Sequence, residues 1–586
     1  MASRVSSPVL IGRARELDRL AATLGVAAEG RSNAVVVAGE AGIGKTRLVS
    51  DFADGARAEG ATVLVGGCID LGEGAVPYAP VIEAFRGFVR HADARQIDDV
   101  FGPNRGELSR LIPDLGPAGA GPEIRLSVGT GQGRLFELVL GVLDRMSRAA
   151  PVVFIVEDLH WSDRSTRDLL GFLVRNLRDA RVALVLTYRS DELHRRHPLL
   201  PFVAELDRTG IVDRVLLTPF DARESAEQLR AIAGHDLPAS LVESIHARSG
   251  GNAFFAEELL AASGEDCETD LPPTLRDVLL ARITDLTEST QEFLRIASAA
   301  GQRVDPDLLA EAASLDEDAL YEALRECVRR QILVPDPDAD LERYAFRHAL
   351  LQEAIYDDLL PGERTRLHSA FARTLERTST DRESHAAELA FHWYAAHDLG
   401  RALAASVAAG ADAEGRYAFP EAQAQYERAI ELWDQVPDAE DRAGRDRIEM
   451  LADLAGVARF TDPGRAVAHI QTAIALVDRS VDPVRAALLS ERLGRYAWIA
   501  GQGELAQRAY QAAVRDIPAE PPSPANARAL AGLAQILMLG ARFEESRTLA
   551  IQAMTMARSI GARDIEGHAL NTGAMDRAMA GEIDEA

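Results

Sequence analysis

The first part of the chain alternates short apolar runs with amphipathic stretches. The apolar runs fall at residues 34–38, 152–156 and 182–187. Each has the length and composition of a strand buried on both faces of a parallel sheet, and helical spacing separates them. We therefore expect a doubly wound α/β domain over residues 9–220, after a loose tail at 1–8. Residues 102–133 are rich in Gly and Pro, which predicts an irregular loop or insertion.

After residue 220 the pattern becomes helical. Residues 221–270 are polar on one side and predict a small helical lid. A Leu-Pro-Pro sequence at 271–273 marks the next boundary. Residues 271–376 contain several amphipathic helices and two short strand candidates, at 332–334 and 344–346. This arrangement fits a winged-helix domain.

Residues 377–586 contain an internal repeat of small side chains. The steps between its members are 466−422=44, 506−466=40, 546−506=40 and 586−546=40. The series reads Ala422, Ala466, Ala506, Ser546 and Ala586. A second small residue follows seven positions later, at Ala429, Ala473, Ala513 and Ala553. Between the two small residues lies a larger side chain in three repeats, at Tyr426, Ile470 and Tyr510. In the fourth repeat this position is Ala550. Such spacing predicts close helix–helix contact along one face.

Two glycines suggest which kind of repeat this is. Gly410 and Gly494 each precede a member of the series by twelve residues, as in tetratricopeptide helix pairs. We expect an all-α, tetratricopeptide-like solenoid with a longer period than usual. Residues 581–586 read as the turn into the second helix of a fifth repeat, so we expect this repeat to be truncated.

Charge and composition exclude several classes of protein. The net charge of −27 and the isoelectric point near 5.0 argue against a broad contact with nucleic-acid phosphates. Neither an N-terminal apolar signal region nor an apolar run long enough for a membrane helix is present. The cysteines, Cys68, Cys267 and Cys327, are far apart and suit a reducing compartment. We expect a cytoplasmic protein without membrane contact.

The chain's single lysine, Lys45, lies in the sequence G-x-x-x-x-G-K-T at 39–46. This is the spacing of a phosphate-binding P-loop. Glycines let backbone N–H groups curl around phosphate oxygens, and the lysine ammonium is compact enough to reach between phosphates. We expect ATP or ADP to contact Gly39, Glu40, Ala41, Gly42, Ile43, Gly44, Lys45, Thr46 and Arg47.

Two acids follow the second apolar run and an arginine follows the third. Glu157 and Asp158 would face the crevice at the carboxyl ends of parallel strands. Together with the Thr46 hydroxyl they are candidates to hold Mg²⁺ and to orient the attacking water, and their division of roles stays open. Arg189 could sense the γ-phosphate, or could be an ordinary surface arginine at a strand end.

Four further segments resemble those of the STAND class of signal-transduction ATPases with numerous domains. They are the IGRAREL sequence at 11–17, LHWSD at 159–163, SGGNAF at 249–254 and YAFRHAL at 344–350. Ala253 stands where the class usually has proline. In layout the chain is most similar to the large ATP-binding LuxR-type bacterial transcriptional regulators, which combine an AAA-type ATPase domain with tetratricopeptide-like repeats.

The resemblance implies roles for four more residues. Gly12 and Arg13 would lie by the adenine and ribose, and Pro219 would pack on the base. His348 would touch the β-phosphate of ADP in a closed state. An equally good interpretation makes His348 a satisfied histidine inside the winged-helix domain. A winged helix can bind DNA, but in this class it usually packs within the switch, and the acidic charge of the chain agrees with that.

These expectations combine into a nucleotide-dependent switch. ADP would hold it closed, and ATP with an inducer or protein on the repeats would favour an open, self-associating form, with slow hydrolysis resetting it. DNA would be contacted only through a C-terminal helix-turn-helix, which these residues do not contain. Two alternatives remain: a repeat scaffold with nucleotide as a structural ligand, and a regulator of a partner enzyme such as a nucleotide cyclase.

Overall fold

The computed structural model describes residues 6–68, 76–116, 131–177, 179–263, 274–313, 316–335, 343–378, 385–518 and 520–582. These residues form two compact units. The first contains residues up to 123 and 132–398, and the second contains 124–131 and residues from Leu399 onward. No helix of the described residues is long and apolar enough to cross a membrane.

A parallel five-stranded sheet organises the first unit. Its order is β2-β3-β4-β1-β5. The strands are β1 (Asn33–Gly39), β2 (Thr62–Gly67), β3 (Val152–Glu157), β4 (Val182–Arg189) and β5 (Val212–Leu216). The three strands predicted from apolar runs are therefore β1, β3 and β4, at the centre of the sheet. Their side chains are almost completely buried, as continuous apolar runs require.

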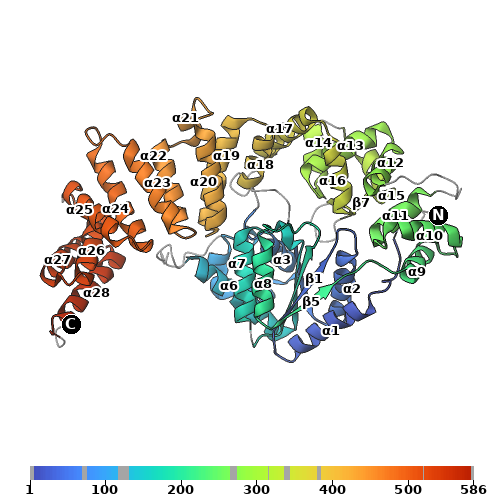
Figure 1. The fold of residues 1–586 in the computed structure, drawn as a ribbon, viewed down its shortest axis with the longest axis horizontal. Helices are drawn as coiled ribbons and strands as arrows, with labels where there is room; N and C mark the ends of the chain where they lie inside the picture. The colour runs from blue at the N-terminus through green and yellow to red at the C-terminus, as the bar shows by residue number, and fades with distance from the viewer. Residues whose placement is uncertain are drawn as a thin grey trace. The chain divides into compact units, whose positions relative to one another are not determined.

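Helices cover both faces of this sheet (Figure 1). On one face lie α1 (Ala14–Ala28) and α2 (Lys45–Ala58), whose buried leucines, valines and alanines share one core with β1, β3 and β4. On the other lie α3 (Ala79–His91), α7 (Arg164–Asn176) and α8 (Leu199–Arg208). The result is the doubly wound arrangement that alternating patterns predict.

The segment 102–133 is more regular than expected. It contains η2 (Gly102–Asn104), α5 (Arg105–Leu108) and η3 (Pro113–Leu115), preceded by α4 (Ala94–Phe101), and α6 (Gly131–Ala149) begins near its end. Leu108, Leu111, Ile112 and Leu115 are buried. These apolar side chains stabilise short helices despite the Gly and Pro content. The remaining positions, 117–130, lie outside the described residues.

Helices dominate the rest of the first unit. The expected lid consists of α9 (Ala222–Ala233), α10 (Ala239–Ser249) and α11 (Ala253–Ala262); the predicted boundary at 271–273 and Cys267 lie outside the described residues. The next helices are α12 (Leu275–Thr284), α13 (Glu288–Ala300), α14 (Pro306–Ala313), α15 (Glu317–Arg329), α16 (Ala349–Asp358), α17 (Pro361–Thr378) and α18 (Ala386–Ala395).

A small antiparallel sheet lies among these helices. Its order is β6-β8-β7, formed by β6 (Arg303–Val304), β7 (Leu333–Pro335) and β8 (Tyr344–Phe346). Two of its strands are those expected at 332–334 and 344–346. Helix α18 packs on α17, so the first unit extends to Asp398, beyond the expected boundary at 376/377.

The second unit is a series of antiparallel helices. They are α19 (Leu399–Gly415), α20 (Phe419–Trp433), α21 (Ala439–Ala443), α22 (Arg447–Ala458), α23 (Pro463–Leu476), α24 (Pro483–Ile499), α25 (Gly503–Asp516), α26 (Pro524–Leu539), α27 (Phe543–Ser559) and α28 (Arg563–Met579). The small residues at 422, 466, 506 and 546, and their partners seven positions later, are fully buried. Residues 583–586, including Ala586, lie outside the described residues.

Candidate functional site

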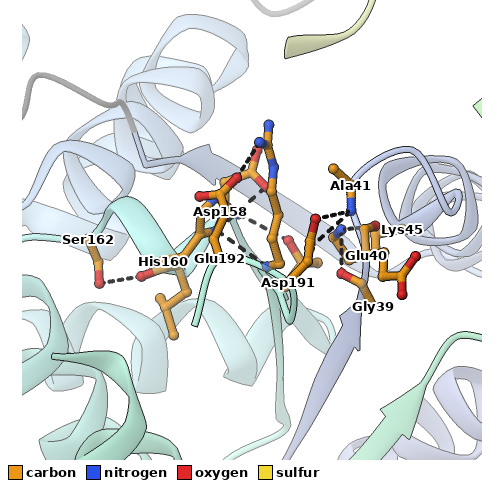
Figure 2. Close-up of polar contacts among 12 residues, drawn as sticks. Gly39, Glu40, Ala41, Lys45, Asp158, His160, Ser162, Asp191 and Glu192 are labelled. Atoms are coloured by element: carbon orange, nitrogen blue, oxygen red, sulfur yellow. Dashed lines mark hydrogen bonds and ion pairs between the residues drawn. The ribbon is translucent and has the colours of Figure 1, made fainter. Parts of the chain in front are cut away.

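The segment between β1 and α2 forms a tight loop that contains two glycines. Gly42 and Gly44 have φ of 77° and 102°, the left-handed region that glycine adopts without strain. Lys45 then begins α2 and is 7% exposed. Its Nζ donates to the carbonyl oxygens of Gly39 and Glu40, each at 2.9 Å (Figure 2). Burial lowers the pKa of Lys45, and the nearby Asp158 carboxylate opposes that change.

A carboxylate lies on this loop. Asp191, two residues beyond β4, accepts from the backbone N–H of Ala41, with N–O distances of 3.2 and 3.3 Å (Figure 2). The loop thus already receives an anion at one of its N–H groups, and Lys45 stands beside it. Together with the positive φ angles, this donor arrangement fits a phosphate.

The segment predicted to be a lid contacts the loop from another side. Asn252 caps α11 and its Nδ2 donates to the carbonyl of Ala41 at 2.8 Å, while the N–H of Phe254 donates to the carbonyl of Gly42 at 3.0 Å. The preceding Gly251 packs on the backbone of Phe220, where a Cβ would come within 2.2 Å of the Phe220 oxygen. Gly251 therefore has a steric role at the Phe220 backbone, and Asn252 makes the contact with the phosphate loop.

The two acids at the end of β3 lie in different surroundings. Burial raises the pKa of Glu157 to about 7, the neighbouring Asp158 adds to that, and a hydrogen bond from Thr46 opposes it. Among the described residues, Glu157 Oε1 has no hydrogen-bond partner. Burial also raises the pKa of Asp158, but Arg189 and Lys45 oppose this. The residues expected to hold Mg²⁺, Thr46, Glu157 and Asp158, are therefore brought together, with a buried carboxylate oxygen still free to bind a cation.

His160 connects the acids to β4. Its ring is buried, its Nε2 lies 3.4 Å from Glu192 Oε2, and its Nδ1 lies 3.4 Å from the backbone nitrogen of Arg189. Burial lowers the pKa of His160 to about 2, and the positive charges of Arg189 and Lys45 lower it further. His160 is thus a neutral ring that positions the end of β4.

Arg189 is buried at 4% exposure and is not a surface arginine. Its guanidinium pairs with Glu192 and, at 2.9 Å, with Glu353 of α16. It also lies over the ring of Trp161, 4.7 Å from the ring centroid. A side chain at the carboxyl end of the sheet is therefore tied to a helix more than 160 positions later in the sequence.

His348 lies at the N-terminal end of the same α16. Its Nδ1 accepts from the N–H of Leu350 at 3.2 Å, and its ring stacks on Phe254 of the lid, with centroids 4.0 Å apart. Burial is the main cause that lowers the pKa of His348 to about 3, and the positive charges of Arg189, Arg347 and Lys45 also lower it. His348 is thus helix-capping and packed, and it is also close enough to the phosphate loop to feel its charge.

Gly12, Arg13 and the segment around Pro219 meet at the other end of the loop. Arg13 is 4% exposed and donates to the carbonyl of Thr218 at 2.7 Å, and its guanidinium lies 4.6 Å from the centroid of Phe220. A Cβ on Gly12 would meet Glu224 of α9 at 2.5 Å. Pro219 is exposed. Arg13 therefore joins the N-terminal segment to the exit of β5, beside the exposed proline.

Comparison with known proteins agrees with this geometry. Residues 9–186 match the family model of an AAA ATPase domain. The matched segment contains the phosphate loop and both acids, and Arg189 lies three residues beyond its end.

Other proteins are similar over longer stretches. An uncharacterized protein of Rhizobium meliloti is 26% identical over 467 residues, 75% of this chain. The chain spans 44% of that protein's length. The crystal structure of a STAND protein with a tetratricopeptide repeat sensor, from Pyrococcus horikoshii, is 14% identical and covers 98% of this chain and 88% of its own, with a TM-score of 0.41. A RuvB variant of Thermotoga maritima is 15% identical and covers 60% and 96%, with a TM-score of 0.25.

Within the ATPase domain, one expected ligand contact has another partner. Arg47 lies on the outer side of α2 with 47% of its side chain exposed, and it pairs with Asp51 at 3.1 Å. Among the described residues, no group of three or more His, Cys, Asp or Glu side chains is arranged to hold a metal ion alone. Any Mg²⁺ at Thr46 and the two acids would need phosphate oxygens to complete its ligands.

Four residues of the site were not expected. Asp191 and Glu192 follow Arg189 almost directly, so their place after a central strand could have identified them. Asn252 was visible only as part of a motif. Glu353 carries no local signal, because its contact with Arg189 depends on how α16 packs in the first unit.

Proposed function

We propose that the protein is a nucleotide-dependent signalling switch of the bacterial transcriptional regulator type, closed with ADP and opened by ATP together with an inducer. The observation that carries this proposal is the ion pair between Arg189 and Glu353. It connects the end of β4, where Arg189 pairs in register with Gly39 of the phosphate loop, to α16. A γ-phosphate beside Lys45 would compete with Glu353 for the same guanidinium.

A second set of contacts joins α16 to the lid. Arg347, directly before His348, pairs with Glu257 of α11, and its Nη1 lies 3.5 Å from Glu258 Oε1. Glu258 is fully buried and also pairs with Arg282 of α12. The segment 347–353 therefore touches the lid at one end and Arg189 at the other. A change at the phosphate loop could release both, which is what a two-state switch requires.

The proposed roles follow the positions of the side chains. Lys45 and the loop N–H groups would bind phosphates, Thr46, Glu157 and Asp158 would hold Mg²⁺ and orient water, and Arg189 would sense the γ-phosphate. Gly12, Arg13 and Pro219 would border the base, and His348 would lie near the β-phosphate of ADP. Turnover would be slow, because Asp191 and Glu353 hold the loop and Arg189 in protein contacts.

The single lysine gives a direct test. Purified protein is treated with acetic anhydride with and without ADP, and acetylation of Lys45 is followed by mass spectrometry with the N-terminal amine as internal reference. Nucleotide released on denaturation is identified in parallel, and ATP turnover is measured for Lys45→Ala and for Arg57→Ala, a surface change on the same helix.

We expect ADP to protect Lys45 from acetylation in the wild type and in Arg57→Ala. We expect the bound nucleotide and the slow turnover to be lost in Lys45→Ala only. Absence of protection and turnover in a folded protein would overturn the switch. Tight binding without turnover, with Lys45→Ala unfolded, would support the alternative of a repeat scaffold with structural nucleotide.

A further inference from the structure

A cavity of about 480 Å³ opens between α22 and α24 in the second unit. Its lining includes Arg445, Ile448, Asp453, Arg485, Leu488 and Arg492. Its size is within the range of small-molecule sites. The site lies in helical repeats and is separate in sequence from the phosphate loop.

The cavity is located where the repeat is irregular. Helices α24 and α26, and α26 and α28, pack directly on one another, whereas α22 and α24 have no comparable packing. The step from Ala422 to Ala466 is also 44 residues, against 40 for the following steps. Within this longer step lies the short helix α21, which ends at Gly444; Gly444 has a φ of 66° and borders the cavity. A local lengthening of the repeat therefore accompanies the gap between helices.

The arginines at the cavity differ in their partners. Arg485 forms two bonds of 2.5 Å to Asp446, which bridge the gap between the helices, and Arg445 pairs with Asp453 at 2.5 Å. Arg492 has no partner among the described residues, although it is partly buried. The chain as a whole is acidic, with a net charge of −27, so it repels most anions. An unpaired guanidinium at a cavity can nevertheless bind one anionic group there.

The other lining side chains restrict the ligand further. An apolar surface lines part of the cavity and is formed by Ile448, Ala452, Leu488 and Leu489. The Leu488 residue is 38% exposed. Glu449 and Asp453 also border the cavity and would repel a second negative charge. The site thus favours a ligand with a single charge and an apolar body.

We propose that this cavity binds a small monocarboxylate, with its carboxylate on Arg492 and its hydrocarbon part on Ile448 and Leu488. A guanidinium and a carboxylate match as a planar, two-bond pair, and the apolar wall gains from burying hydrocarbon. Within the switch, this ligand would serve as the inducer, and that role rests on the proposed function. Binding of the monocarboxylate to the cavity does not depend on the proposed function.

The test measures binding of 4-phenylbutanoate and octanoate to the full chain by titration calorimetry. The uncharged 4-phenylbutanamide and the doubly charged succinate are the comparison ligands. The variants are Arg492→Gln, Leu488→Gln and, as a matched control, Arg508→Gln, an exposed arginine on α25 without a partner among the described residues. Thermal unfolding confirms that each variant is folded.

We expect saturable binding of at least one carboxylate and about tenfold or more weaker binding of the amide and succinate. Arg492→Gln should lose binding by a similar factor, Leu488→Gln should weaken it severalfold, and Arg508→Gln should leave it unchanged. The proposal is overturned if neither carboxylate binds, if Arg492→Gln binds equally well, or if a tetraglutamate peptide binds in their place.

The same titration on Lys45→Ala separates this inference from the switch. Carboxylate binding should persist in that variant. If the wild type binds carboxylate but ADP release stays the same, the cavity is a ligand site and its coupling to the switch is refuted. If ADP behaves as proposed but no carboxylate binds, only the cavity proposal fails.

Discussion

The carboxylate of Asp191 lies on the backbone N–H of Ala41, at 3.2 and 3.3 Å. The acid therefore occupies part of the anion-binding face of the phosphate loop. It also lowers the positive potential near Lys45, since its charge acts on that ammonium. A nucleotide phosphate would have to displace this side chain and would then be repelled by it. We therefore expect Asp191 to make nucleotide binding weaker than the loop alone would allow.

Replacement of this acid should strengthen nucleotide binding. We expect Asp191→Asn to bind ADP about three- to tenfold more tightly at low salt, because the amide keeps the size of the side chain and removes its charge. Fluorescence titration with a labelled ADP measures this, with Asp54→Asn on α2 as a control for net charge. Unchanged affinity in Asp191→Asn would show that the carboxylate moves away at no cost.

The pair between Arg189 and Glu353 should control how long ADP stays bound. Glu353→Gln removes one charge from the pair and leaves Arg189 with Glu192. Since 38% of the Glu353 side chain is exposed, we expect a moderate effect: ADP release about three- to tenfold faster. Stopped-flow displacement of labelled ADP measures the rate, and Glu322→Gln on α15, an exposed acid, is the matched control. Equal ADP release rates in the two variants would show that Glu353 has no role in retaining ADP.

The outcome for individual residues shows what sequence patterns could reveal. Lys45 was predicted from the G-x-x-x-x-G-K-T spacing, and Glu157 and Arg189 were predicted because each follows an apolar run that becomes a central strand. Parallel pairing then brings these strand ends to one edge of the sheet. A hydrophobic pattern fixes such positions without knowledge of tertiary contacts.

Contacts between distant elements were beyond the reach of local patterns. Glu353 is one of several acids on an amphipathic helix, and nothing in its surroundings marks it as the partner of Arg189. Arg13 was assigned to the nucleotide by resemblance, yet its guanidinium also bonds to the carbonyl of Thr218. Residues 102–133 were expected to be irregular from composition, whereas buried Leu108 and Ile112 support short helices there. Packing decided each of these cases.

The raised pKa of Glu157 predicts a pH-dependent affinity for Mg²⁺–nucleotide. With a pKa of about 7, Glu157 is mostly protonated at pH 6 and mostly ionised at pH 8. Because Mg²⁺ binds the ionised form, its contribution should be lost as the pH falls through 7. We expect about tenfold weaker Mg–ADP binding at pH 6 than at pH 8, from one group titrating over that range.

Two variants test whether Glu157 is the source of this dependence. Glu157→Gln should flatten the profile and leave only the titration of the nucleotide itself. Asp158→Asn should move the midpoint to lower pH, because the Asp158 charge helps to raise the Glu157 pKa. A profile that is the same in Glu157→Gln and the wild type would assign the titration to another group.

The last prediction concerns the packing of the second unit. The ring of Tyr510 lies against Gly494 of α24 and Gly532 of α26, where an added Cβ would come within 2.8 and 2.5 Å of ring carbons. Gly410 meets Tyr426 in the same way, at 2.4 Å. The glycines that precede the small-residue series therefore make room for an aromatic ring from the adjacent helix. Tyr510 is buried, so the ring has little space to move.

Alanine at these glycines should destabilise the repeats despite its higher helix propensity. We expect Gly532→Ala to lower the free energy of unfolding by about 1–3 kcal/mol, the usual cost of overpacking. Gly567→Ala on α28 meets no atom within 4 Å and should be neutral or stabilising by up to about 1 kcal/mol. Urea unfolding followed by circular dichroism compares the two variants. Equal stability would mean that α25 and α26 can separate enough to admit a methyl group, and the rigid ring contact would then not determine the spacing of the repeats.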